Sequence, residues 1–127
     1  MNNNVDGFSF SGRIRSGMHA LDGIAEIMRS QHNAWLHALA TCCVLAAGLA
    51  FGVSTQEWCF LVVVITGVWV AEALNTAFEL LCDVTSPEFH PLVKKSKDVA
   101  AGAVLLSAVG AAAIGFIIFM PYVMSYF

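Results

Sequence analysis

Three long apolar stretches dominate the pattern of hydrophobic and polar positions. They cover residues 34–52, 57–82 and 98–120 of the 127-residue chain. Each is close to the roughly 20 residues with which a helix crosses the hydrocarbon core of a bilayer. Because a segment surrounded by lipid must satisfy its own backbone hydrogen bonds, we expect three transmembrane helices rather than strands.

The connecting segments agree with this division. The first connection, residues 52–56, is short and turn-prone, so the first two spans should form a tight antiparallel hairpin, and Ser54 or Thr55 can cap the second span. The second connection, residues 83–97, contains two prolines that should interrupt any continuous helix. We expect Pro121 to close the third span.

The segment 10–30 has a different pattern. Apolar residues recur there at steps of three and four, opposite a charged side; the apolar set is Ile14, Met18, Leu21, Ile24, Ala25 and Met28. This pattern predicts an amphipathic helix on the cytoplasmic surface of a membrane. A helix that packs against soluble protein would show the same pattern.

Composition supports a membrane protein with one domain over residues 1–127. Hydrophobic residues make up 58% of the chain and charged residues 12%, against about 25% charged in soluble domains. The net charge of −3 and six basic residues do not suggest a nucleic-acid partner. Three spans make a thin bundle, so we expect the chain to oligomerise.

The basic residues predict the orientation. Three of them precede the first span and three lie between the second and third; the full set is Arg13, Arg15, Arg29, Lys94, Lys95 and Lys97. Cytoplasmic loops carry the excess of lysine and arginine. The N-terminus and the second connection should therefore lie in the cytoplasm, and the C-terminus outside.

The second span carries a row of polar side chains. Glu72, Asn75, Glu79 and Asp83 are separated by three, four and four residues, so they share one helix face. A carboxylate at membrane depth costs about 2.5–3.5 kcal/mol on insertion scales, which favours a functional explanation. A structural polar seam between helices is one alternative, and a small transporter that uses Glu72 is another.

A basic segment follows this row and contains Lys94, Lys95 and Lys97. Lysines beside carboxylates suit a polyphosphate with bound magnesium. For Lys94 and Lys95, an anchor to anionic headgroups is an equally good explanation; Lys97 next to Asp98 fits an anchor less well. The chain has no GxxxxGK[ST] loop and no kinase glycine loop. If the chain is a phosphotransferase, its nucleotide site must therefore differ from those of the soluble enzymes.

The ordered combination of residues 71–79, Asp83, 87–92 and 97–105 resembles the prokaryotic diacylglycerol kinase and undecaprenol kinase family of small membrane lipid kinases. Weaker resemblance extends over residues 10–121. His90-Pro91-Leu92 and the stretch 100–105 look closer to the undecaprenol kinase branch.

This resemblance implies an activity and an assembly. It implies a homotrimer in the bacterial inner membrane, built from a surface helix and three spans per subunit. It implies ATP as co-substrate, Mg²⁺ as cofactor, and transfer of the γ-phosphoryl group to a lipid hydroxyl. We expect that lipid to be diacylglycerol, which yields phosphatidic acid, with undecaprenol as a close alternative. A catalytically inactive scaffold subunit is a further alternative.

The resemblance also implies roles for individual residues. Glu72 would be the general base, Glu79 would bind the metal, and Asn75 and Asp83 would support that centre. The nucleotide site would be lined by Glu79, Glu88, Phe89, His90, Lys97, Asp98 and His19.

Two positions depart from the family pattern. Gln31 stands where the family commonly supplies a second metal carboxylate, and Trp35 stands where a nearby arginine is usual. An amide oxygen can bind magnesium but contributes no charge, so we expect weaker metal binding. Gln31 is also the reason for keeping the inactive scaffold as an alternative.

Overall fold

The computed structural model describes residues 9–125, and within that range the fold is entirely helical. The helices are α1 (Phe10–Ser30), α2 (His32–Phe51), α3 (Thr55–Thr85) and α4 (Pro91–Met124). Helices α2, α3 and α4 are long and apolar enough to cross a membrane. The all-helical fold and the three apolar helices predicted from the sequence are therefore confirmed.

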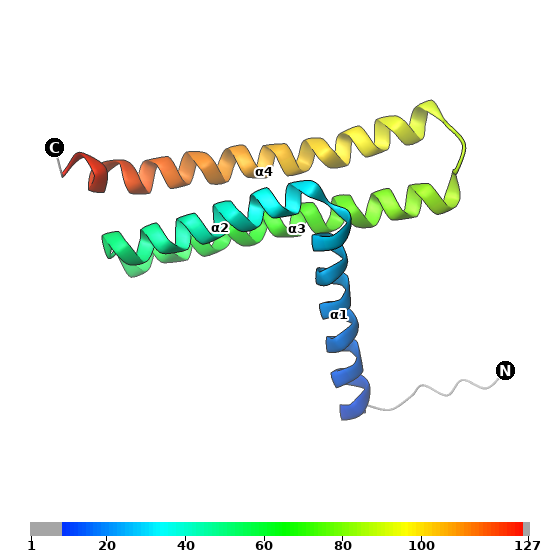
Figure 1. The fold of residues 1–127 in the computed structure, drawn as a ribbon, viewed down its shortest axis with the longest axis horizontal. Coiled ribbons are helices and arrows are strands. Elements are labelled where there is room, and N and C mark those ends of the chain that lie inside the picture. Colours follow the sequence, from blue (N-terminus) through cyan, green and yellow to red (C-terminus); the bar gives the residue numbers. More distant parts are fainter. Residues whose placement is uncertain (1–8, 126–127) are drawn as a thin grey trace.

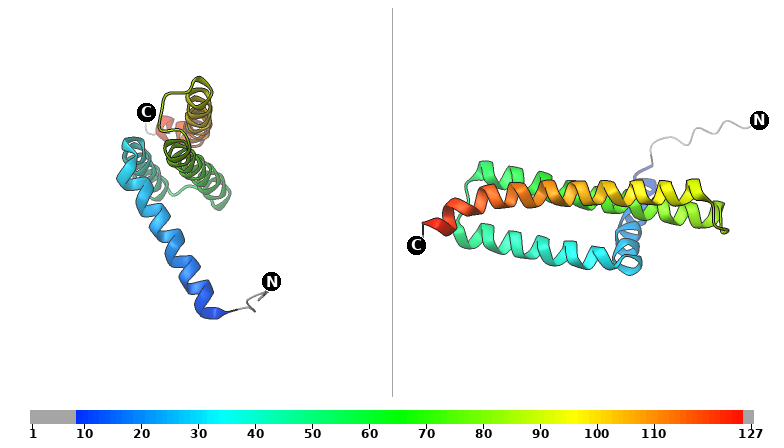
Figure 2. Two further views of the ribbon diagram at one scale, coloured as in Figure 1. Left: turned by 90° about the vertical axis from the view of Figure 1, so that its right-hand side faces the viewer. Right: turned by 90° about the horizontal axis from the view of Figure 1, so that it is seen from above.

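The three apolar helices lie side by side, and α1 leaves the bundle at a steep angle (Figures 1 and 2). Helix α3 packs extensively against α4 and less closely against α2, while α1 contacts α2 and α3 near its own C-terminal end. Only Gln31 separates α1 from α2, and its extended backbone (φ −112°, ψ 118°) forms the corner.

The first connection is as tight as predicted. Gly52 ends α2 in the left-handed conformation with φ 64°, which glycine adopts without steric cost. The Ser54 hydroxyl accepts a hydrogen bond from the Glu57 N–H at 3.3 Å, and the Glu57 carboxylate accepts one from the Ser54 N–H at 2.7 Å. This reciprocal capping box starts α3 at the position expected for Ser54.

The second connection is shorter than predicted, because residues 86–90 alone separate α3 from α4. Pro91 occupies the start of α4, where its missing N–H has no consequence, and the His90 ring nitrogen Nδ1 accepts the Leu92 N–H at 3.2 Å. The lysines expected in a loop, such as Lys97, therefore lie in the first turns of α4.

The expectation that Pro121 closes the third span is wrong. Helix α4 continues through Pro121 to Met124. A proline inside a helix removes one backbone hydrogen bond, and membrane helices tolerate this where other groups satisfy the freed carbonyl. The chain keeps a helical bond beyond this point, from the Ser125 N–H to the Pro121 carbonyl at 3.1 Å.

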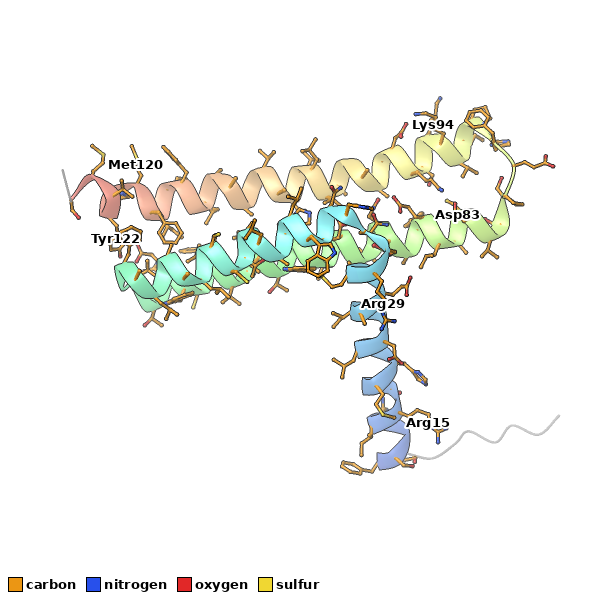
Figure 3. All side chains as sticks on the ribbon, in the orientation of Figure 1. Arg15, Arg29, Asp83, Lys94, Met120 and Tyr122 are labelled. Atoms are coloured by element: carbon orange, nitrogen blue, oxygen red, sulfur yellow. The ribbon has the colours of Figure 1, made fainter. Side chains whose placement is uncertain are left out.

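The apolar core lies at the end of the bundle that holds the α2–α3 turn. Val53, Leu61 and Ile118 are buried together there, with Trp58 and Phe119 among the side chains that pack around them. Figure 3 shows Tyr122 and Met120 at this end, and Asp83 and Lys94 at the opposite end. The core and the polar row of α3 therefore occupy different ends of the molecule.

Candidate active site

The polar row of α3 runs from the interior of the bundle to its exposed end. Glu72 is 1% exposed and Asn75 is 6% exposed, whereas Glu79 is half-buried and Asp83 is exposed. The Asn75 amide donates to Glu79 Oε1 at 3.3 Å, so neighbouring members of the row contact each other. A group that enters at the open end can thus meet acidic side chains at successive depths.

Gln31 reaches this row from the corner between α1 and α2. Its Nε2 donates to Glu79 Oε2 at 2.6 Å, across 48 positions of sequence. Glu79 therefore has amide side chains on both of its oxygens, from Gln31 and Asn75. The three side chains together provide carboxylate and amide oxygens, which are the ligands that magnesium prefers.

The lysines of α4 divide into two kinds. Lys97 Nζ donates to Asp83 Oδ1 at 2.5 Å and so ties α4 to the open end of the row. Lys94 Nζ instead donates to Asp98 Oδ2 at 2.6 Å, within α4 and in an exposed position. The structure brings Lys97 to the row and keeps Lys94 and Asp98 apart from it.

The other residues implied in nucleotide binding do not meet the row within one chain. Phe89 is 80% exposed, Glu88 is exposed in the same connection, and the His90 ring caps α4. His19 faces Asp22 at 3.9 Å on the exposed side of α1. It precedes Gln31 by twelve residues, roughly 18 Å along a helix.

A small cavity of about 180 Å³ surrounds the buried end of the row and is lined by Glu72, Asn75, His37 and Asn33 together with apolar residues of α2 and α4. Both carboxylate oxygens of Glu72, the Asn75 Oδ1 and the His37 Nε2 are buried there without a hydrogen-bond partner among the described residues. Buried polar atoms are seldom left unpaired in folded proteins, and such exceptions often mark functional sites.

Sequence reasoning did not assign His37 to the site. Its Nε2 lies 3.7 Å from Glu72 Oε2, and its side chain is 17% exposed. The available signal was a titratable side chain in an otherwise uncharged span, which favours a functional role. The pairing itself depends on how α2 packs on α3, which the spacing of residues within one helix does not reveal.

A larger cavity of about 520 Å³ lies between α2, α3 and α4, towards the core. His37 and Thr41 are the polar side chains of its lining, and the remaining lining residues are apolar or small. The Thr41 hydroxyl already accepts a hydrogen bond from Trp69 Nε1 at 3.2 Å. The cavity therefore suits a hydrocarbon chain better than a polar ligand.

The structure thus combines three helices long and apolar enough to cross a membrane with a polar row on α3 and a mostly apolar cavity between the helices. Residues 18–119 match the prokaryotic diacylglycerol kinase family, and the chain belongs to that family. It is therefore a lipid kinase, and the resemblance noted in the sequence is confirmed.

Curated relatives include both kinds of lipid kinase. The chain is 42% identical to an undecaprenol kinase of Bacillus subtilis over 108 residues, which are 85% of this chain and 88% of the relative. It is 32% identical to a diacylglycerol kinase of Synechocystis over 84% of this chain and 62% of the relative. A diacylglycerol kinase of Helicobacter pylori is 40% identical over 54% of this chain and 52% of the relative.

Proposed function

We propose that this chain uses Mg²⁺ and ATP to phosphorylate undecaprenol at the cytoplasmic face of a bacterial inner membrane. The observation that carries the choice of lipid is the large cavity between α2, α3 and α4. Its lining is apolar apart from His37 and Thr41. Undecaprenol has a single hydroxyl on a hydrocarbon chain, so it needs few polar partners. The identity and coverage of the Bacillus subtilis undecaprenol kinase support the same choice.

Diacylglycerol is the second candidate. The matches to two diacylglycerol kinases favour it. Its two ester carbonyls are polar groups that lose hydrogen bonds to water on entering an apolar cavity. The small cavity near Asn33 and Asn75 has amide groups that could receive one of them, so diacylglycerol is a testable alternative.

The proposed site assigns one task to each part of the polar row. Glu79 and the amide oxygens of Asn75 and Gln31 would hold Mg²⁺, and Asp83 would support that centre. Lys97, which donates to Asp83 Oδ1, would bind the ATP phosphates at the open end. The unpartnered Asn75 Oδ1 supports the fit of a cation. Magnesium sites commonly use one or two carboxylates and complete the shell with substrate phosphates and water. When bound, Mg²⁺ would neutralise charge on the phosphates.

The proposed reaction is an in-line displacement at the γ-phosphorus. The lipid oxygen forms a bond to phosphorus while the bond to the β-phosphate oxygen breaks and ADP leaves. Glu72 accepts the hydroxyl proton on one carboxylate oxygen. Phosphoryl transfer depends mainly on positioning and on charge neutralisation, with a base that orients the hydroxyl.

The assembly and orientation belong to the same proposal. We place the N-terminus and the 86–90 connection in the cytoplasm, with α1 on the membrane surface. The exposed apolar side chains of α1 support this placement, among them Phe10, Ile14 and Leu21. A homotrimer would let His19, Glu88, Phe89, His90 and Asp98, which one chain keeps apart from the row, approach the row of a neighbouring copy.

The test is phosphoryl transfer from radiolabelled ATP in mixed micelles that contain equal amounts of undecaprenol and diacylglycerol. We expect labelled undecaprenyl phosphate to form with the higher kcat/KM. Preferential labelling of diacylglycerol would contradict the proposed lipid. Absence of label in both lipids, with folded protein, would contradict the catalytic assignment.

A further inference from the structure

His37 of α2 stands at the junction of the two cavities. It lines both the small cavity around Glu72 and the larger apolar cavity. Ala108 of α4 is the other residue common to both linings, and its methyl group forms no hydrogen bonds. His37 is therefore the polar side chain that borders both the apolar cavity and the cavity around Glu72.

The aromatic ring of Trp69 lies beside the His37 ring. The Trp69 ring meets it edge-on, with centroids 6.4 Å apart and planes inclined by 70°. The Trp69 indole is itself fixed by its hydrogen bond to Thr41, one turn after His37 on the same helix. This arrangement leaves His37 Nε2 facing the carboxylate of Glu72.

The two facing groups complement each other. At 3.7 Å, His37 Nε2 and Glu72 Oε2 are slightly beyond hydrogen-bond distance, and both atoms are buried without another partner among the described residues. The nearby Thr76 hydroxyl is already used, because it donates to the Glu72 backbone carbonyl at 2.9 Å. A small side-chain movement would satisfy both atoms at once, and an unmade buried hydrogen bond is costly.

We infer that His37 is a positioning residue for the general base. Its Nε2–H donates to Glu72 Oε2, which leaves Glu72 Oε1 directed at the lipid hydroxyl at the cavity junction. The hydroxyl proton passes to Oε1 as the new O–P bond forms and ADP departs, and His37 keeps its own proton throughout. This inference rests on the role proposed for Glu72 in lipid phosphorylation.

The kinetic test compares three variants of the purified full-length protein. His37→Ala removes the donor, His37→Gln keeps an N–H donor at similar reach, and His32→Ala is a matched control at an exposed position of the same helix. We expect His37→Ala to lower kcat by about tenfold or more, the effect of losing a hydrogen bond to a charged group. The KM for ATP should stay unchanged, His37→Gln should recover part of kcat, and His32→Ala should match the wild type.

Three kinetic outcomes would overturn the inference. They are a kcat of His37→Ala within twofold of the wild type, a His37→Gln variant as slow as His37→Ala, and a change confined to the KM for the lipid. The last outcome would mean that His37 shapes the cavity without acting on the base.

A spectroscopic test covers the case in which the His37 variants do not fold. Protein labelled with ¹⁵N-histidine gives NMR signals from the ring nitrogens of its four histidines. Glu72→Gln should shift the signals of His37 while leaving those of His19 unchanged. Unchanged His37 signals would overturn the pairing. Because this test needs no turnover, it separates failure of the pairing from failure of the proposed lipid kinase reaction.

Discussion

The two ends of the α2–α4 bundle differ in how fully their polar side chains are hydrogen-bonded. At the end with the α2–α3 turn, Glu57 accepts hydrogen bonds from Ser54 and from the Tyr122 hydroxyl at 2.7 Å, beside a buried apolar core. At the other end, both oxygens of Glu72 and the Asn75 Oδ1 are buried without a partner among the described residues.

Each end holds acidic residues of α3, but their surroundings give them different tasks. Glu57 completes a helix cap and accepts a hydrogen bond from Tyr122 of α4, so its carboxylate stabilises the fold. Glu72 is buried without hydrogen-bond partners among the described residues, where stability alone would favour an apolar side chain. Carboxylates of one helix can therefore serve structure or chemistry, and the completeness of their hydrogen bonds separates the two roles. We expect mutations at one end to change turnover and mutations at the other to change stability.

The largest effect should follow from Glu72→Gln. The substitution removes the base while preserving the shape of the side chain, so kcat should fall by about 10²- to 10⁴-fold, with the protein still folded. Steady-state assays with radiolabelled ATP measure this loss. Glu57→Gln makes the same change in the same helix and should keep near-wild-type turnover; equal losses in both variants would break the distinction between the two ends.

A smaller effect is expected from Gln31→Glu, which adds a charged oxygen ligand beside Glu79. The magnesium concentration for half-maximal activity should fall, by about tenfold, because a carboxylate binds this hard cation better than an amide. Magnesium titrations at saturating ATP measure it. Gln56→Glu, an exposed change at the opposite end, is the control, and an unchanged titration for Gln31→Glu would place residue 31 outside the metal shell.

Gly48→Ala should act on stability without acting on turnover. A Cβ atom at position 48 would lie 2.6 Å from Trp58 Cη2, so the indole beside the core must shift. Overpacking of this kind costs about 1–3 kcal/mol, offset by about 1 kcal/mol of improved helix propensity. Unfolding in detergent should show a net destabilisation of about 1 kcal/mol. Gly110→Ala, with open space around it, should not destabilise; a more stable Gly48→Ala variant would show that Trp58 is not held in place.

The smallest effect should come from Tyr122→Phe, which removes only the hydroxyl that donates to Glu57. The other hydrogen bonds of Glu57 to Ser54 remain, so the midpoint of thermal unfolding should fall less than in Gly48→Ala. Ser54→Ala, which removes the helix cap, should cost more than Tyr122→Phe. A loss of turnover in either variant would mean that this end contributes to catalysis.

Much of the fold could be predicted from the sequence because it depends on local patterns. Apolar length predicts the three spans, and the Ser54-to-Glu57 spacing predicts the cap that the structure contains. The ends of α4 could not be predicted in the same way. Pro91 and Pro121 both suggest interruption, yet one begins the helix and the other lies inside it, because the cost of a proline depends on which backbone bond it removes.

The candidate site was predictable only in part. The row from Glu72 to Asp83 follows from helical spacing within α3, and Lys97 meets its open end. The contact of Gln31 with Glu79 and the facing of His37 and Glu72 depend on the packing of separate helices. Periodicity within a helix identifies a polar face but does not identify the partner that covers it.

We propose that the acidic row of α3 and Lys97 together hold the nucleotide beside Glu72. The most direct measurement is a structure of the membrane-embedded protein with Mg²⁺ and a non-hydrolysable ATP analogue. We predict that the triphosphate lies at the Glu79 and Lys97 end, with its γ-phosphorus as the phosphorus nearest to Glu72. A nucleotide bound at the Glu57 and Tyr122 end, or away from α3 altogether, would contradict the account.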